Sequence, residues 1–471
     1  MASELPRIRI KPLFYNLVRS LCVLAGMCLL AASPAQAAEA AKPAVTAFVH
    51  VNVLPMDRER ALSDQTVLVE DGKVAAMGAD LAIPAGAKII DGHGRDWLSP
   101  GLADMHIHST TSRDMKLYLA NGVTTVLHMG GETAGFMDQV RPELNAGTRP
   151  GPHFYASLIV DSTPRYGDFQ VTTPDEARWT VRLARTNGYD FIKVYNDVSP
   201  EVFAALIEEG RKLQVPVVGH GVTKVGIERQ LAMGQLMVAH TEEYMYTVFF
   251  EPESPPEVSE PRPGDMERAI AFTKRAGAYV TADINTYGAI ARQWGRPEVV
   301  DRALKMPEFR YLDPDDRLRW VNESYKDRKG SVDARAAMLA RFEKKMADAG
   351  VKLITGTDAP TIPGLVPGFS LHDDLDALEA AGLTRWQVLS AATRTPGEMI
   401  KGSLPNADTF GVIAPGARAD LILSSSNPLD GLATLRRPLG VMARGNWYAA
   451  ADLQAMIDGL AAQYDRIAVH N

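Results

Sequence analysis

Two histidines separated by one residue are the strongest chemical signal in this chain of 471 residues. His106 and His108 lie in the segment Asp-Met-His-Ile-His, directly after the run Leu-Ser-Pro-Gly-Leu at 98–102. Residues two apart in a β-strand face the same side, so these two imidazoles can bind one metal ion. Such a pair also occurs by chance, so the prediction depends on what the rest of the chain places beside it.

Four other polar residues stand at or just after the ends of apolar, strand-like runs. They are Lys193 in Phe-Ile-Lys-Val-Tyr, His220 in Val-Val-Gly-His-Gly, His240 in Val-Ala-His-Thr-Glu-Glu and Asp358 in Ile-Thr-Gly-Thr-Asp-Ala. In a barrel of parallel strands, the active site is built at the carboxyl ends of the strands. We therefore expect all four side chains to meet the two histidines at one rim.

The elements that must position these residues alternate between helix and strand from about Leu98 onward. In one unit, Thr173 and Glu176 form a capping box, the helix ends at Asn-Gly 187–188, and the strand 190–194 follows at once. Residues 199–218 repeat this order, with a Ser-Pro helix start and a final Val-rich strand. This alternation predicts a parallel (β/α)₈ barrel of the TIM type, in the α/β class.

The two ends of the mature chain have a different pattern, with short β-type runs broken by turn residues. The runs are 47–53, 65–70, 73–77 and 88–90 near one end, and 419–423 and 439–443 near the other. Asp71-Gly72 is a hairpin signal. We predict a composite small β-sandwich domain from 45–98 and 408–450, a barrel over 99–407 and a C-terminal helix over 451–471.

The first 37 residues have the composition of a secretory signal. Four basic residues precede an apolar run at 21–32, and Ala35-Gln36-Ala37 provides a cleavage site. The run is short for a membrane span, although an uncleaved N-terminal anchor is the alternative. Cleavage near Ala37 predicts a periplasmic or secreted protein that retains no stable membrane anchor.

Composition narrows the chemistry further. Both cysteines, Cys22 and Cys28, lie within the signal, so the mature chain offers no thiol for a disulfide or a metal site. Removing the signal, with its four basic residues and one acidic residue, takes the net charge from −7 to about −10. That balance makes nucleic acid an unfavourable partner and leaves a small molecule as the expected one, while a homo-oligomer stays open.

The six residues, in this order and at these spacings, resemble the amidohydrolase superfamily. The resemblance is to its branch similar to imidazolonepropionase, which includes metal-dependent dipeptidases and carboxypeptidases, and it covers nearly the whole mature chain. The tail segments 411–421 and 427–430 agree with it. It implies two divalent metal ions, with zinc expected. The ligands it implies are His106, His108 and Asp358 for the first ion, and His220 and His240 for the second.

The same resemblance gives Lys193 the role of bridging the two ions. A free ammonium cannot bind a cation, so this role requires Lys193 to be carboxylated to a carbamate with one oxygen for each ion. The alternative for a buried strand lysine is a salt bridge with a carboxylate.

The chemistry implied is hydrolysis of an amide. Two cations flanking one water lower its pKa and hold a bridging hydroxide ready to attack the polarised carbonyl. Asp358 would act as general acid and base toward the leaving amine, or would serve only as a ligand. Substrate contacts are expected from residues near the same rim, namely His128, Arg165, Tyr166, Tyr195 and His372. Of these, Arg165 could pair with a substrate carboxylate, as a carboxypeptidase requires.

Three functions remain open on the sequence. The first is hydrolysis of an amide bond, in a dipeptide or N-acyl amino acid. The second is hydrolysis of a cyclic amide, a lactone or another ester by the same centre. The third is a non-catalytic scaffold barrel, because fold alone does not determine function. Two long connections, 244–265 and 295–330, would either cover the substrate site or form surface insertions.

Overall fold

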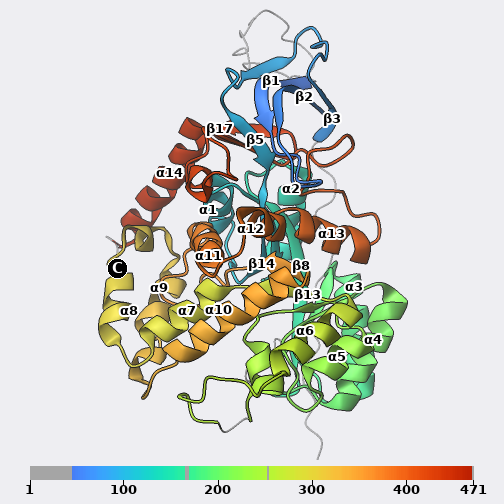
Figure 1. Cartoon of the computed structure of the whole chain (residues 1–471), viewed down its shortest axis with the longest axis vertical. Coiled ribbons are helices and arrows are strands. Elements are labelled where there is room, and N and C mark those ends of the chain that lie inside the picture. Colours follow the sequence, from blue (N-terminus) through green and yellow to red (C-terminus); the bar gives the residue numbers. More distant parts are fainter. Residues whose placement is uncertain (1–44, 165–168, 252–253, 469–471) are drawn as a thin grey trace, which may run out of the picture. The chain divides into compact units, whose positions relative to one another are not determined.

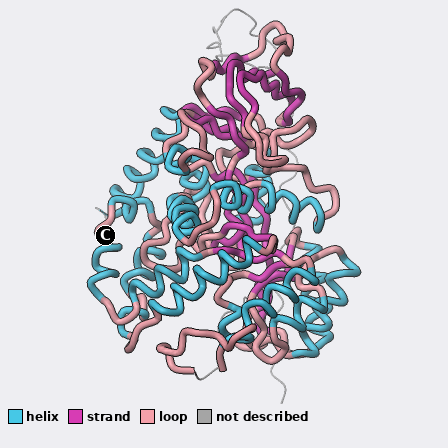
Figure 2. Tube along the Cα trace, in the orientation of Figure 1, coloured by secondary structure: helices cyan, strands magenta, loops and turns pink. Residues whose placement is uncertain are grey.

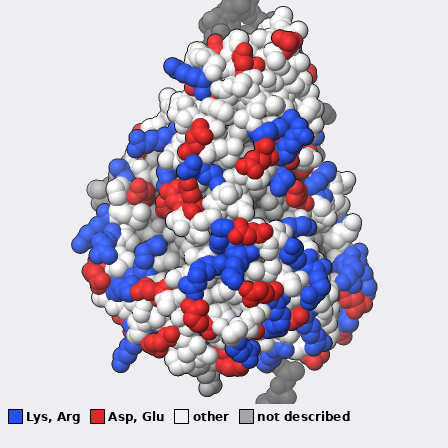
Figure 3. All heavy atoms as spheres, in the orientation of Figure 1, with Lys and Arg blue, Asp and Glu red and all other residues white. Residues whose placement is uncertain are grey.

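The structure is a computed structural model that describes residues 45–164, 169–251 and 254–468. The predicted signal, residues 1–37, lies outside the described residues. Within the described part, no helix is long and apolar enough to cross a membrane. Acidic and basic side chains are interspersed over the face seen in Figure 3.

A barrel of eight parallel strands occupies the larger part of the fold (Figures 1 and 2). The strands are hydrogen-bonded in their order along the chain: β6 (Leu102–Ile107), β7 (Val123–His128), β8 (His153–Asp161), β10 (Phe191–Val194), β11 (Val217–Gly219), β12 (Met237–Val238), β13 (Tyr279–Ala282) and β14 (Lys352–Thr355). The short strand β9 (Phe169–Gln170) adds to β8. The predicted TIM barrel is confirmed.

The barrel is completed by the backbone that follows β14. The amides of Thr357 and Asp358 both donate to the carbonyl of His106, at 3.1 and 2.8 Å. Thr355 Oγ1 donates to the Ala103 carbonyl at 2.8 Å. The last strand is therefore joined to the first at the position where candidate site residues lie.

Helices surround these strands, which are buried on both sides and so consist of nearly continuous apolar residues. The helices are α1 (Asp114–Ala120), α2 (Arg141–Ala146), α3 (Pro174–Thr186), α4 (Pro200–Leu213), α5 (Ile227–Met233), α6 (Asp265–Ala276), α7 (Ile284–Gln293), α10 (Asp333–Asp348), α11 (Phe369–Ala380), α12 (Arg385–Ala392) and α13 (Arg394–Ser403). Single π-helical turns are η1 (Phe136–Val140) and η2 (Met245–Phe249).

The unit around α3 forms as its sequence predicts. Thr173 and Glu176 make the reciprocal capping box, and Asn187 is the C-cap. The face with Ala177 and Val181 is buried against the strands. In the next unit, Ser199 caps α4 through the amide of Val202. These local signals set where each helix returns the chain to the barrel.

A second sheet of eight strands combines strands that precede the barrel in the sequence with strands that follow it. They are β1 (Val45–Val53), β2 (Leu62–Glu70), β3 (Lys73–Gly78), β4 (Lys88–Asp91), β5 (Trp97–Pro100), β15 (Leu421–Ser424), β16 (Gly440–Ala443) and β17 (Asn446–Ala449). β5 pairs with β1 on one side and β15 on the other, so the strands are connected in one sheet. Asp71 and Gly72 form the expected hairpin turn, both with positive φ.

A buried ion pair ties this sheet to the barrel. Arg418 and Asp420 pair at 2.5 Å and are almost fully buried. Arg418 also donates to Thr125 of β7 at 2.5 Å. The 3-10 turn η5 (Leu432–Arg436) and the helix α14 (Ala450–Ala468) complete the C-terminal part, and α14 contacts α1.

The connection between α7 and α10 is helical, whereas the sequence suggested a long loop. Residues 295–330, here called the cap, contain α8 (Pro297–Ala303), η3 (Pro307–Tyr311), α9 (Pro314–Val321) and η4 (Tyr325–Asp327). A proline starts each of the first three, where its missing amide hydrogen is not needed. Figure 1 shows α8 beside α7.

Candidate metal centre

The six candidate ligands come from five strands and meet at the carboxyl ends of those strands. His106 and His108 lie at the end of β6, Lys193 near the end of β10, and the other three just after β11, β12 and β14. His106 and Lys193 are almost completely buried, with exposed fractions of 0% and 1%. These six residues, which are far apart in the sequence, therefore lie close together at one end of the barrel.

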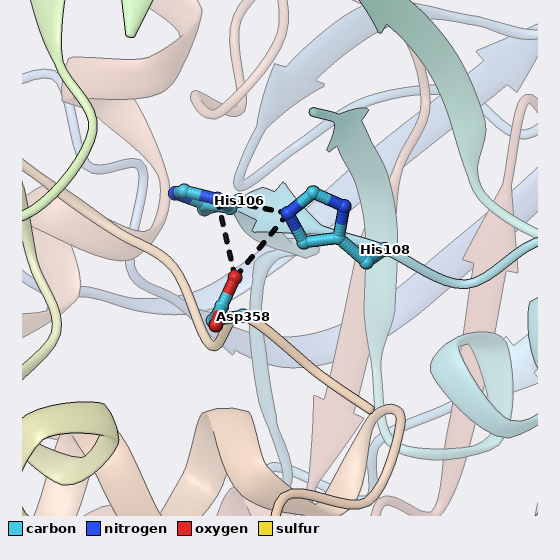
Figure 4. Close-up of side chains that lie close together, drawn as sticks. All are labelled: His106, His108 and Asp358. Carbon is cyan, nitrogen blue, oxygen red and sulfur yellow. Dashed lines mark hydrogen bonds and ion pairs between the residues drawn. The ribbon is translucent and has the colours of Figure 1, made fainter. Parts of the chain in front are cut away.

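Three donor atoms form a compact group (Figure 4). Those of His106, His108 and Asp358 all lie within 4.8 Å of one another. Asp358 Oδ1 is 3.3 Å from the Nε2 atom of each histidine, and the two Nε2 atoms are 3.3 Å apart. Two nitrogen atoms and a carboxylate oxygen facing one point are the donor set that a divalent transition metal prefers.

The opposite ring nitrogens of the four histidines are all engaged by oxygen atoms. His106 Nδ1 lies 3.1 Å from the Ala239 carbonyl and His108 Nδ1 lies 3.0 Å from the Gly130 carbonyl. His220 Nδ1 pairs with Glu243, and His240 Nδ1 pairs with Asp283. An oxygen at Nδ1 keeps the proton there and leaves the Nε2 lone pair available to a metal.

Asp358 is held in a position that presents one oxygen to the histidines. Its backbone adopts φ +56°, the left-handed region that is uncommon for a residue other than glycine. Thr361 Oγ1 donates to Asp358 Oδ2 at 2.6 Å, which leaves Oδ1 facing His106 and His108. Strained backbone of this kind persists where the surrounding structure fixes it, often at functional sites.

Lys193 extends into the same group. Its Nζ atom lies 3.3 Å from His106 Nε2 and 3.5 Å from His108 Nε2. The Lys193 nitrogen therefore adjoins the donor atoms of the residues that the family resemblance implies as ligands of the first ion.

His220 and His240 adjoin the compact group without being part of it. The ring centroids of His106 and His240 are 4.3 Å apart, and those of His220 and His240 are 5.1 Å apart. His220 Nε2 is buried and makes no hydrogen bond to a described residue. A buried imidazole nitrogen with no partner fits a ligand of a second ion.

Burial and charge set the ionisation of this cluster. Burial, and next the charge of Lys193, holds the pKa of His106 well below its usual value, so its lone pair is free. Burial also lowers the pKa of His220 to about 4, despite Glu243. Burial acts against the charged form of Asp358, but interactions with His108 and His106 keep its pKa well below the usual range. Burial opposes the charged form of His240, but the carboxylate of Asp283 raises the pKa of this histidine to about 9. His106 and His220 are therefore the neutral imidazoles beside the anionic oxygen of Asp358, an arrangement that suits a cation.

Comparison with known proteins places the chain in a family. Residues 97–448, most of the chain, match the amidohydrolase family. This chain belongs to that family. The sequence prediction of a hydrolase of the amidohydrolase family is thereby confirmed, and the fold agrees with it.

Two solved structures and one curated relative are similar to this amidohydrolase. A bottromycin amidohydrolase is 23% identical, with a TM-score of 0.70, and the match covers 90% of this chain and 91% of the other. A Xaa-Pro dipeptidase with bound methionine is 17% identical, with a TM-score of 0.61 and coverage of 86% and 100%. An imidazolonepropionase from Cupriavidus pinatubonensis is 39% identical over 54 residues. That segment spans only 11% of this chain and 13% of the relative.

The residues that we expected to contact the substrate do not all lie at the cavity. Tyr195 lines the cavity over the centre, and its ring stacks on His220 at 3.9 Å. Arg165 and Tyr166 lie outside the described residues. His372 is buried on α11 and bonds through Nε2 to the Asn121 carbonyl at 2.9 Å, near the amino end of β7. That end is opposite the carboxyl ends of the strands, so this contact gives His372 a packing role.

His128 adjoins His108, with the ring centroids 6.0 Å apart, but does not line the cavity. It is fully buried, and its Nδ1 atom is 2.7 Å from Glu132 Oε2. The Gly130 amide approaches the same nitrogen at 3.3 Å, and the Gly130 carbonyl bonds to His108. His128 therefore supports the turn that orients His108, and the contacts give no direct approach to a substrate.

Sequence reasoning missed the carboxylates of Glu243 and Asp283. Both are buried and each pairs with a candidate ligand, as described above. Two signals were present: Glu243 is three residues after His240 in the quoted Ala-His-Thr-Glu-Glu segment, and Asp283 directly follows β13. A carboxylate on the far nitrogen of a ligand histidine fixes its tautomer and orientation.

The amide variant Glu243→Gln is expected to weaken metal binding roughly 10- to 100-fold while the barrel stays folded, because the carboxamide orients His220 less firmly and withdraws the negative charge. Competition with a chromogenic chelator measures the change. Exposed Glu208→Gln on α4 is the matched control. An unchanged affinity would show that Glu243 has no part in metal binding.

Proposed function

We propose that this amidohydrolase is an exported enzyme that hydrolyses an amide bond in a dipeptide or N-acyl amino acid. It would use two divalent metal ions, with zinc expected, and a carboxylated Lys193. The observation that carries the proposal is the placement of Asp358 Oδ1 3.3 Å from two Nε2 atoms, with Lys193 Nζ 3.3 and 3.5 Å from the same atoms.

The residues of the chain have separate parts in this reaction. His106, His108 and Asp358 would hold the first ion, His220 and His240 the second, and Lys193 both. When bound, such ions lower the pKa of a shared water and polarise the scissile carbonyl. Asp358 would also accept a proton on its carboxylate and deliver that proton to the leaving amine. Tyr195, which lines the cavity, would help to orient the substrate.

The cavity over this centre suits a substrate of that size. Its volume is about 560 Å³, and its wall includes His108, Lys193, His220, His240 and Asp358. Pockets for small molecules typically span roughly 300–1,000 Å³. The candidate ligands can be reached from one cavity, and this supports an enzyme over a scaffold. A non-catalytic scaffold does not require a set of metal ligands that is open to a small molecule.

The test is a substrate panel run on protein recovered from the periplasm after expression with added zinc. We expect two metal ions per chain, turnover of dipeptides or N-acyl amino acids, loss of turnover on chelation and an N-terminus just after Ala37. Turnover of lactones or cyclic amides alone would replace the proposed substrate class. A chain with well under one ion and no turnover would favour the scaffold, and a retained N-terminal segment would favour the anchor.

A further inference from the structure

The cavity has a second wall, supplied by the cap. Residues of α9 and of the segment after it line this cavity together with the candidate ligands. They are Arg319, Glu323, Ser324, Tyr325 and Arg328. The same cavity therefore connects the candidate ligands at the barrel rim to a polar wall on an insertion that the barrel itself does not need.

The cap is fixed in position over the centre. Trp320 is fully buried in it and donates from Nε1 to the Pro360 carbonyl at 2.8 Å, two residues after Asp358. At its other end, Trp294 Nε1 donates to the Lys329 carbonyl at 2.8 Å, and the Trp294 ring stacks on Tyr325. Side chains on this wall are thus held by anchors on both sides, as a recognition surface requires.

Two arginines provide the positive charge of this wall. The guanidinium of Arg328 lies over the Trp294 ring, 5.8 Å from its centroid, and forms no ion pair with any described residue. Arg319 pairs with Asp316 at 3.1 Å and keeps about half of its side chain exposed. A guanidinium stacked on an aromatic ring keeps its outer edge free to donate in a bidentate manner to a planar anion.

The two glutamates that line the same cavity each have one oxygen engaged by a local donor. Glu323 Oε1 accepts the amides of Ser324 and Tyr325, at 2.6 and 3.0 Å. Glu242 Oε1 accepts the hydroxyl of Tyr246 at 3.3 Å. These bonds turn carboxylate oxygens toward local donors, so the cap wall offers Arg328 to a ligand.

We propose that Arg328, assisted by Arg319, binds a carboxylate of the substrate at the cap wall of this cavity. The inference rests on the proposed amide hydrolysis and assigns the substrate class: an acidic amide whose carboxylate is held by the cap while its carbonyl lies at the centre. This role belongs to the cap, whereas the sequence suggested Arg165 for it.

The test compares an N-acyl amino acid with the matched N-acyl amine, which lacks the carboxylate. The wild-type enzyme is expected to prefer the acid by about 100-fold in kcat/KM. Arg328→Met keeps the aliphatic stem against Trp294 and is expected to reduce this preference roughly 10- to 100-fold, mainly through KM. The preference of Arg328→Lys should fall between those of the wild-type enzyme and Arg328→Met, because lysine keeps the positive charge but cannot donate in a bidentate manner. The Arg319→Met/Arg328→Met double variant should abolish the preference.

The matched control is Arg296→Met, since Arg296 lies on the same cap but pairs with Asp333 and does not line the cavity. An unchanged preference in the double variant, with the amine still hydrolysed, would overturn the role of the cap and leave the metal centre intact. Calorimetric binding of the N-acyl amino acid to an Asp358→Ala background supplies a readout without turnover. Arg328→Met should weaken that binding about tenfold or more, and equal affinity would refute the inference even if neither compound is hydrolysed.

Discussion

The variant Asp358→Asn is expected to lower kcat by roughly 10⁴-fold or more while the protein remains folded. Asparagine keeps the shape of the side chain, so the bond from Thr361 persists. It removes the negative charge that faces His106 and His108, and it removes the group proposed to carry the proton. Loss of general acid and base catalysis alone lowers the rate by about 10²–10⁴-fold, and weaker binding of the proposed ion lowers it further.

Single-turnover and steady-state kinetics on the best panel substrate measure this loss, with metal content and thermal unfolding measured in parallel. Asp376→Asn is the control, because Asp376 pairs with Arg436 on the protein surface. A normal kcat in Asp358→Asn would contradict the mechanism. A normal metal content with lost turnover would separate proton transfer from metal binding.

Lys193→Met is expected to lower kcat/KM by two or more orders of magnitude and to reduce the metal content below two ions per chain. Methionine fills the buried space near His106 and His108 but cannot form a carbamate. Without the bridging oxygens, the second ion would depend on His220 and His240 alone, which is too few ligands for tight binding.

Carbon-13 NMR with labelled bicarbonate tests the carbamate directly. The wild-type protein should show a carbamate signal after growth or reconstitution with metal and bicarbonate, and Lys193→Met should lack it. Lys212→Met, an exposed position on α4, is the matched control. Full metal content and full activity in Lys193→Met would refute the bridging role, and a wild-type protein without the signal would favour an ammonium at this position.

The sequence predicts the positions of the site residues well because the barrel imposes a simple rule. Any polar residue at the end of a buried parallel strand is brought to the same rim. His220 directly follows a Val-Val-Gly strand, and Lys193 interrupts an apolar one, so their convergence is readable without coordinates. The capping boxes and the Asp-Gly turn are equally local and equally predictable.

Residues whose role depends on tertiary contacts are less predictable. Glu243 and Asp283 act on histidines of preceding segments, and only the arrangement of neighbouring strands reveals the pairs. His128 and His372 have the residue type of a catalyst, yet one pairs with Glu132 behind the turn and the other bonds at the opposite barrel end. Histidine type and strand position cannot distinguish these outcomes.

The cap illustrates a third limit. The cap is rich in charged residues and its helices are short. Neither apolar periodicity nor segment length therefore distinguishes these helices from a loop in the sequence. Trp320 becomes informative only when its bond to the Pro360 carbonyl is known, because that bond holds the cap to the segment that follows Asp358.

The seam that closes the barrel also gives the centre a place in the order of folding. Asp358 is joined to His106 through the backbone bond that unites the last strand with the first. His106 belongs to the first barrel strand and Asp358 follows the last one, so the two residues are separated by almost the whole barrel sequence. Contacts between residues so far apart in sequence form slowly, because closing the intervening chain costs conformational entropy. A nascent chain that stops before β14 therefore lacks one side of the first site. Binding of the proposed ions would therefore come late in folding, after the last strand has joined the first.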